Sequence, residues 1–306
     1  MTAFGNTTSP EDIAETSITK PYAPIHVTTI YVLINVFVVI INSFHLLIIT
    51  MNDKLFSFSK NHRTFLILLA VLDLLLGFFR MIFSNQKMQQ AFVDHNWLCV
   101  LSQIVVQGLM ISAFGVILLM AFDRVIATRA TYAENWYVRH FKWMNLAFCL
   151  VVFAIYGGIA IAWHNTGAYK IKGLACCDIR RRERITLVFA WIVQFFTIIF
   201  YAGLLYAIRF KSSSGNSLES NTTRRIKMEI VRVLGYLLLV HFLMLAVTTT
   251  SVFVKNLPFW WWFRFVCASA LALNPLFDPI VYGVVSKEYR KKLSSLSLRS
   301  RSVGIT

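Results

Sequence analysis

The sequence predicts an all-α membrane protein built as a bundle of seven transmembrane helices. The 306 residues are 57% hydrophobic and only 14% charged, which leaves too few polar side chains to cover a soluble domain. The hydrophobic residues also gather into separate runs of about 20 residues, the length of helix that crosses about 30 Å of hydrocarbon. These two observations together predict the fold class.

Seven such runs follow one another along the chain. They begin near Ile25, Thr64, Cys99, Trp143, Ile185, Ile230 and Phe259. We therefore expect residues 1–24 to form an extracellular N-terminal segment, residues 25–285 the seven-helix bundle, and residues 286–306 a cytoplasmic tail. Residues 1–24 lack the apolar core of a cleavable signal peptide, so the first span is expected to direct insertion itself.

The distribution of Lys and Arg predicts the orientation. Of the 30 basic residues, 19 lie in segments 51–63, 124–142, 209–232 and 286–306, against 9 in the opposite loops. By the positive-inside rule, the N-terminus is outside and the C-terminus is cytosolic. Most of the net charge of +16 would then face anionic inner-leaflet lipid, so nucleic acid is not an expected partner.

The predicted outer face carries two covalent features. Asn6 begins an Asn-X-Thr sequon and is a predicted glycosylation site. Three cysteines lie at this oxidising face, and we expect one disulfide from Cys99 to either Cys176 or Cys177. That bond would attach the loop between the fourth and fifth helices to the outer end of the third. Cys149 lies within an apolar run and is expected to pack without reacting.

Polar residues inside the apolar runs point to function. The seventh run carries Asn274 and Asp278 one turn apart, each followed by a proline. A buried carboxylate is costly in hydrocarbon unless it faces a protein interior or water, so the bundle is expected to have a polar centre. Proline bends a helix and frees carbonyl groups, which makes this stretch deformable.

Several polar positions form an ordered series along the chain. They are Asn42 in the first span, the sequence Leu69-Ala70-Val71-Leu72-Asp73 in the second, Asp123-Arg124-Val125 closing the third, Asp278-Pro279-Ile280-Val281-Tyr282 in the seventh, and the basic segment 286–292 after it. In addition, Cys99 stands 25 residues before Arg124, which corresponds to about 37 Å of helix. In order, spacing and depth, the chain resembles the rhodopsin-like (class A) G-protein-coupled receptors.

This resemblance implies a receptor that catalyses nothing and passes ligand binding to a heterotrimeric G protein. It implies that Asp123 restrains Arg124 at rest, that Arg124 meets the G protein, and that Tyr282 and Tyr201 turn inward in the active form. It also implies a short amphipathic eighth helix over residues 286–292. Serines at 212–220 and 294–302 are candidate phosphorylation sites for a receptor kinase and an arrestin-like partner.

Asp73, Asn274 and Asp278 form the first candidate site. Their oxygens suit a hard cation, and the resemblance implies an allosteric Na⁺ pocket. Ala113 replaces the serine that the family usually offers, with Ser112 one residue away. The open alternative is a hydrated network in which one of the two carboxyls keeps its proton.

A second candidate site faces the predicted outer side. Val106 stands where biogenic-amine receptors carry an aspartate, so an amine ligand is not expected. Arg80 and Arg264 are expected to enter one cavity and to favour an anionic ligand group. The remaining candidate contacts are Gln103, Gln107, Met110 and Phe242. The alternatives are that Arg264 extends to the membrane interface and that Arg80 pairs with Asp94 or a carbonyl.

The chain departs from the family pattern in two helices. The fifth and sixth spans contain no proline, and His241 with Phe242 stands where the family usually has a CWxP motif. Two other function classes are therefore open alternatives. A transporter or channel would show internal repeats, and a membrane-embedded zinc hydrolase would need about three converging histidines or carboxylates, whereas only His45 and His241 lie well inside spans.

Overall fold

The computed structural model describes residues 25–51, 60–84, 96–129, 136–165, 179–213, 221–253, 260–287, 289–291 and 293–294. Nearly all of these residues are helical, and none of them forms a strand. The long helices are α2 (Ile25–Thr50), α3 (Lys60–Phe83), α5 (Asn96–Arg129), α6 (Trp136–Asn165), α7 (Ile179–Ser213), α8 (Asn221–Phe253) and α9 (Trp260–Val285). Their length and composition make the chain an all-α membrane protein.

Five of these helices contain an apolar stretch long enough to cross a membrane. The stretches are Thr29–Thr50, His62–Phe83, Val100–Ile126, Thr186–Ile208 and Met228–Thr250. Helices α6 and α9 contain shorter apolar stretches, Trp143–Ile159 and Ala272–Val285. Several helices begin before the hydrophobic run that predicted them, because a helix continues into polar residues beyond the hydrocarbon; α8, for instance, begins at Asn221 rather than near Ile230.

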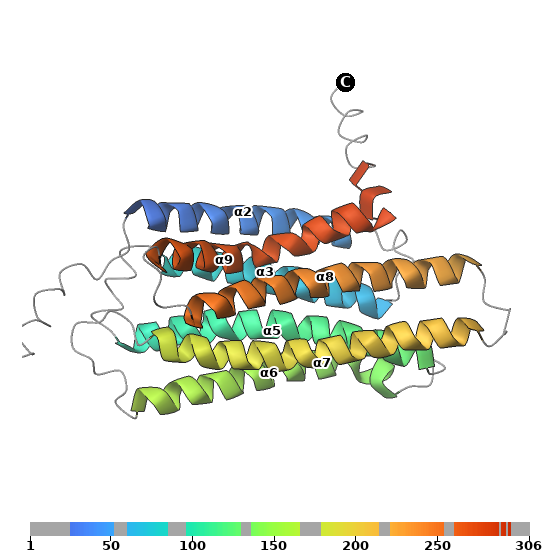
Figure 1. Ribbon diagram of the computed structural model, residues 1–306, viewed down its shortest axis with the longest axis horizontal. Coiled ribbons are helices and arrows are strands. Elements are labelled where there is room, and N and C mark those ends of the chain that lie inside the picture. Colours follow the sequence, from blue (N-terminus) through green and yellow to red (C-terminus); the bar gives the residue numbers. More distant parts are fainter. Residues whose placement is uncertain are drawn as a thin grey trace, which may run out of the picture.

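The helices lie side by side, roughly along the long axis of the molecule (Figure 1). Helix α5 is central, because it packs against α3, α6, α7 and α8. Helix α9 packs against α8 on one side and α2 on the other, and α2 packs against α3. The contacts therefore close the bundle, so that side chains from α2, α3, α5, α8 and α9 can meet in its interior.

Two glycines allow α5 and α6 to approach closely. A Cβ added at Gly115 would lie 2.1 Å from Cε1 of Phe148, and one at Gly108 would lie 2.6 Å from Cε1 of Phe153. Small residues of this kind bring helices together in membranes, where dispersion contacts supply much of the association energy. Phe148 and Phe153 thus fill the space that the missing α5 side chains leave.

The exposed and buried faces have the pattern expected for a protein in lipid. Large apolar side chains such as Phe44 and Phe195 are about 60% exposed, whereas charged residues are buried in the interior. Asp73, Asp123 and Asp278 are all at most 3% exposed. Buried carboxylates need partners, and those partners define the candidate site.

After α9, Tyr289 returns to the bundle. It is 4% exposed, its backbone amide donates to Oγ of Ser286 over 3.3 Å, and its hydroxyl lies 2.9 Å from Nδ1 of His45 on α2. This contact fixes the segment that follows α9 against the first helix of the bundle.

Candidate functional site

The predicted polar centre is present in the middle of the bundle. Asp73 on α3 and Asp278 on α9 both lie at this centre, and their carboxyl groups are close enough to act on each other electrostatically. Two carboxylates this close repel each other when both are ionised, which favours a proton or a cation between them. Asn274 lies one turn from Asp278 on the same face of α9 and is 9% exposed.

His241 on α8 joins this pair. Its Nδ1 lies 2.8 Å from the carbonyl oxygen of Leu237, so Nδ1 carries a proton and donates it. Its Nε2 points to Oδ1 of Asp278 at 3.8 Å, and Phe114 of α5 holds the ring edge-on, with centroids 5.4 Å apart. The imidazole is therefore fixed with one nitrogen toward the carboxylate.

The cluster contains acceptor atoms that the described residues do not satisfy. Oδ2 of Asp73, Oδ1 of Asp278, Oδ1 of Asn274 and Oδ1 of Asn42 are buried and accept no hydrogen bond from them. Asn42 uses its amide nitrogen to reach the carbonyl oxygen of Pro275 at 3.1 Å. Buried oxygens of this kind require water or a cation. We name Asn42, Asp73, His241, Asn274 and Asp278 the central cluster.

Ser112 does not join the central cluster in place of the serine that Ala113 replaces. Ser112 is fully buried, but it lies beside the Cys149 thiol on α6. Cys149 itself is a free, half-buried cysteine.

Among the described residues, no group of three or more His, Cys, Asp or Glu side chains is arranged to hold a metal ion. The side-chain oxygens of the central cluster belong to Asn42 on α2, Asp73 on α3, and Asn274 and Asp278 on α9.

The second group of polar residues lies at the end of the bundle opposite Arg80. We name this end of the bundle the Arg124 end. Nε of Arg124 donates to Oδ2 of Asp123 over 2.9 Å, and Nη2 contacts the same oxygen. The Asp123 side chain is fully buried and that of Arg124 is 11% exposed. The guanidinium is thus folded back on its neighbour along α5.

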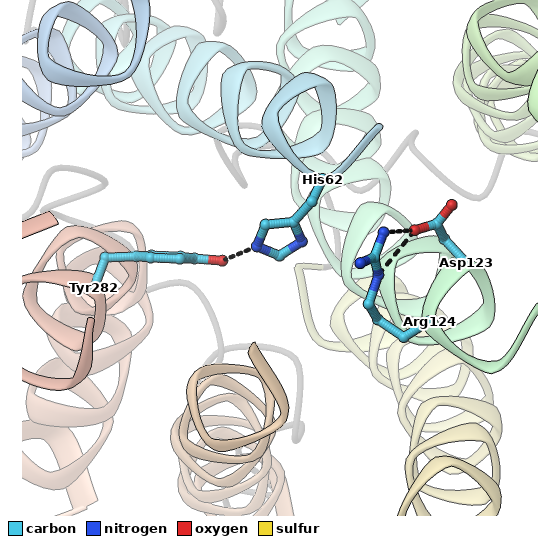
Figure 2. Close-up of polar contacts among 4 residues, drawn as sticks. All are labelled: His62, Asp123, Arg124 and Tyr282. Carbon is cyan, nitrogen blue, oxygen red and sulfur yellow. Dashed lines mark hydrogen bonds and ion pairs between the residues drawn. The ribbon is translucent and has the colours of Figure 1, made fainter. Parts of the chain in front are cut away.

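His62 connects this ion pair with α9. Figure 2 shows its imidazole between the Tyr282 hydroxyl and the Arg124 guanidinium. Nε2 of His62 lies 3.5 Å from the hydroxyl oxygen of Tyr282, and the Arg124 charge acts on both residues. Tyr282 is fully buried and also packs against His45 and Tyr289, with ring centroids 5.8 and 6.3 Å away.

Tyr201 on α7 is held away from this group. Its hydroxyl donates to the carbonyl oxygen of Val231 on α8 over 3.3 Å. The ring lies over Gly235, where an added Cβ would be 2.3 Å from the hydroxyl oxygen. Tyr201 and Tyr282 therefore have different partners in this structure, and neither contacts the other.

The predicted ligand-contact residues are only partly brought together. Arg80 is 6% exposed and enters the bundle, where Nη2 lies 3.8 Å from Sδ of Met110 and its charge acts on Asp73. Val106 and Gln107 are half-buried on α5. Phe242 instead packs against Trp191 of α7 and is 37% exposed.

Several predictions fall outside the described residues. Asn6, Cys176 and Cys177 lie outside them entirely, and for Cys99, Gln103 and Arg264 only the helical backbone is described. The disulfide, the glycosylation site and the Arg264 half of the anion site stay predictions.

His62 was missed, although the spacing along α3 could have indicated it. His62 precedes Asp73 by 11 residues and Arg80 by 18, which are about three and five turns of helix. The three ionisable residues therefore lie on one face of α3, which turns toward α5 and α9. Helix α3 packs against both α5 and α9, in agreement with this placement.

No family model matches the chain, and no curated protein matches it. The residues of the two polar groups and their geometry are therefore what points to a function.

Proposed function

We propose that the chain is a divergent rhodopsin-like G-protein-coupled receptor of the plasma membrane. It would pass binding of an extracellular ligand to a heterotrimeric G protein, with its N-terminus outside and its C-terminus in the cytosol. All seven long helices are proposed to span the membrane, and the segment after α9 to form a short amphipathic helix on the inner leaflet. Helical backbone at the described residues between Lys287 and Ser294 supports that last point.

One observation carries the proposal. Ionisable side chains from α3, α5, α8 and α9 are buried at two depths of the same bundle: the central cluster, and the group of His62, Arg124 and Tyr282 at the Arg124 end. Charges buried in a membrane are costly and mark functional positions. A purely structural bundle would gain stability from apolar residues at these places.

The described arrangement fits the resting form of such a switch. Asp123 holds Arg124, His62 holds Tyr282, and Tyr201 is docked on α8. Activation would release Arg124 for the G protein and bring the two tyrosines inward. A ligand can drive this change only if it binds the two forms unequally, and Arg80, with its charge near Asp73, is proposed to couple an anionic ligand group to the central cluster.

Nucleotide exchange on the G protein tests the proposal directly. We expect Arg124→Ala to abolish exchange, measured per receptor at the cell surface, because Arg124 is only 11% exposed in the ion pair and has to leave it to meet a partner. Lys291→Ala, which removes an exposed cation at the same end, is the control and should couple normally. Undiminished exchange in Arg124→Ala would contradict the assigned role.

The unsatisfied oxygens of the central cluster support an allosteric Na⁺ site as a second element of the proposal. Coordination of Na⁺ would use Asp73, Asn274 and Asp278 and favour the resting form. Ligand affinity should then depend on NaCl but not on choline chloride, and Asp73→Asn should lose that dependence. A hydrated, protonated cluster would instead respond to both salts alike.

Two alternative classes are weaker. A transporter or channel would also bury charges, but repeats between the two halves of the sequence are not observed. A membrane-embedded hydrolase would need converging metal ligands, and the described residues offer no such group. A screen of acidic metabolites, lipids and peptides with a promiscuous G-protein reporter separates the receptor from both, since neither alternative would activate a G protein.

A further inference from the structure

Helices α8 and α9 enclose a groove at the Arg124 end that the receptor mechanism does not use. Its volume is about 890 Å³. On α8 it is lined by Arg232, Tyr236 and Val240, which follow one another at four-residue spacing and so lie on one face. The lining on α9 runs from Phe277 to Val285. With Met228 and Glu229 also lining it on α8, the groove extends about 18 Å along α8 and about 12 Å along α9.

The groove opens toward the surrounding membrane and not into the bundle. Tyr236 is 52% exposed, Ile280 49% and Val284 67%, whereas the neighbouring Tyr282, on the interior face of α9, is fully buried. The walls lie within stretches apolar enough for the membrane. The natural occupant of such a trough is a hydrocarbon chain.

Positive charge closes the groove at one end. Arg232 and Lys287 both line it and both are exposed, and neither side chain forms an ion pair with another described residue. Glu229 is the third charged group of the lining, and its Oε1 accepts a hydrogen bond from the backbone amide of Lys287 over 2.7 Å. This end of the groove thus has a net positive charge, because it holds two cations and one carboxylate, and the carboxylate already accepts a hydrogen bond.

We propose that this groove binds one anionic phospholipid. The phosphate lies between Arg232 and Lys287, and an acyl chain lies along Tyr236, Ile280 and Val284. Charge-assisted hydrogen bonds from the two cations hold the phosphate, and the same cations repel the ammonium group of a zwitterionic headgroup, so a net anionic headgroup is favoured. Anionic lipid is concentrated in the cytoplasmic leaflet, which this end of the bundle faces if the proposed orientation is correct.

Retention of defined lipids by the full-length protein tests this proposal. The protein is exchanged into nanodiscs of phosphatidylcholine containing a tenth phosphatidylglycerol with identical acyl chains, then released for native mass spectrometry. We expect one phosphatidylglycerol to stay bound. Equal retention of the two lipids would overturn the proposal, and because no G protein is involved, the outcome does not depend on coupling.

Two matched pairs of variants locate the site. Lys287→Gln should weaken phosphatidylglycerol binding about tenfold, whereas Lys291→Gln, an exposed lysine on the same segment outside the groove, should leave it unchanged. Equal losses from both would show general attraction to the membrane surface and refute the assigned headgroup site.

The acyl-chain part is tested in the same way. Val284→Trp fills the groove and should abolish retention, whereas Val266→Trp on the same helix, 58% exposed and outside the groove, should not. Both side chains are exposed, so folding is expected to survive; Ile280→Ser provides a second probe and should weaken retention. Binding that survives both groove substitutions contradicts the proposal.

Discussion

Replacing Gly235 by alanine should disturb the proposed switch at one defined contact. An added Cβ would lie 2.3 Å from the hydroxyl oxygen of Tyr201 and 3.0 Å from its Cζ. The phenol must therefore move, and it can do so because it is the end of a flexible side chain. Moving it breaks the hydrogen bond from that hydroxyl to the carbonyl oxygen of Val231.

The magnitude follows from two opposing terms. Loss of one neutral hydrogen bond costs about 1 kcal/mol, and alanine in place of glycine within a helix gains about 1 kcal/mol. Overall stability in Gly235→Ala should therefore change little. The helix term acts in both resting and active forms, however, whereas the lost hydrogen bond belongs only to the resting form. The population should then shift toward the active form by a factor of about 5.

Ligand-independent nucleotide exchange, normalised to surface expression, measures this shift. We expect about a fivefold rise in Gly235→Ala. Gly203→Ala on α7 is the control, because an added Cβ there meets nothing within 4 Å, and its basal exchange should equal that of the wild type. Equal basal exchange in the two variants would falsify the role given to the docked Tyr201.

Further expectations concern packing and ionisation. Gly115→Ala should lower the free energy of unfolding by about 1–3 kcal/mol, since its Cβ would overlap the Phe148 ring, whereas Gly158→Ala, with open space around it, should not; thermal unfolding in detergent distinguishes them. Burial raises the pKa of Tyr289 to about 12, so the folded state keeps this proton longer than the unfolded state. The stabilisation from this tyrosine should persist below about pH 10 and fade between pH 10 and 12. The absorbance at 295 nm is titrated for the wild type and for Tyr289→Phe, and the difference between the two curves should show an ionisation near pH 12. An ionisation near pH 10 would contradict the buried position.

The sequence determined the helical fold because hydrophobic composition and run length follow directly from the thickness of the bilayer. It also indicated that Asp73, Asn274 and Asp278 lie near one another, since polar and ionisable side chains within apolar spans are stable only where they face a shared protein interior. These arguments need no knowledge of which helix neighbours which. Helix ends were harder, because a helix extends into polar residues without a change of hydropathy.

Side-chain partners depended on the tertiary structure. Whether His241 or Phe242 faces the interior is decided by the rotation of α8 about its axis, and packing against α5 and α9 turns His241 toward Asp278. The contact of His62 with Tyr282 likewise joins residues 220 positions apart. The α8–α9 groove could not be read from either helix alone, because a groove exists only between two packed surfaces.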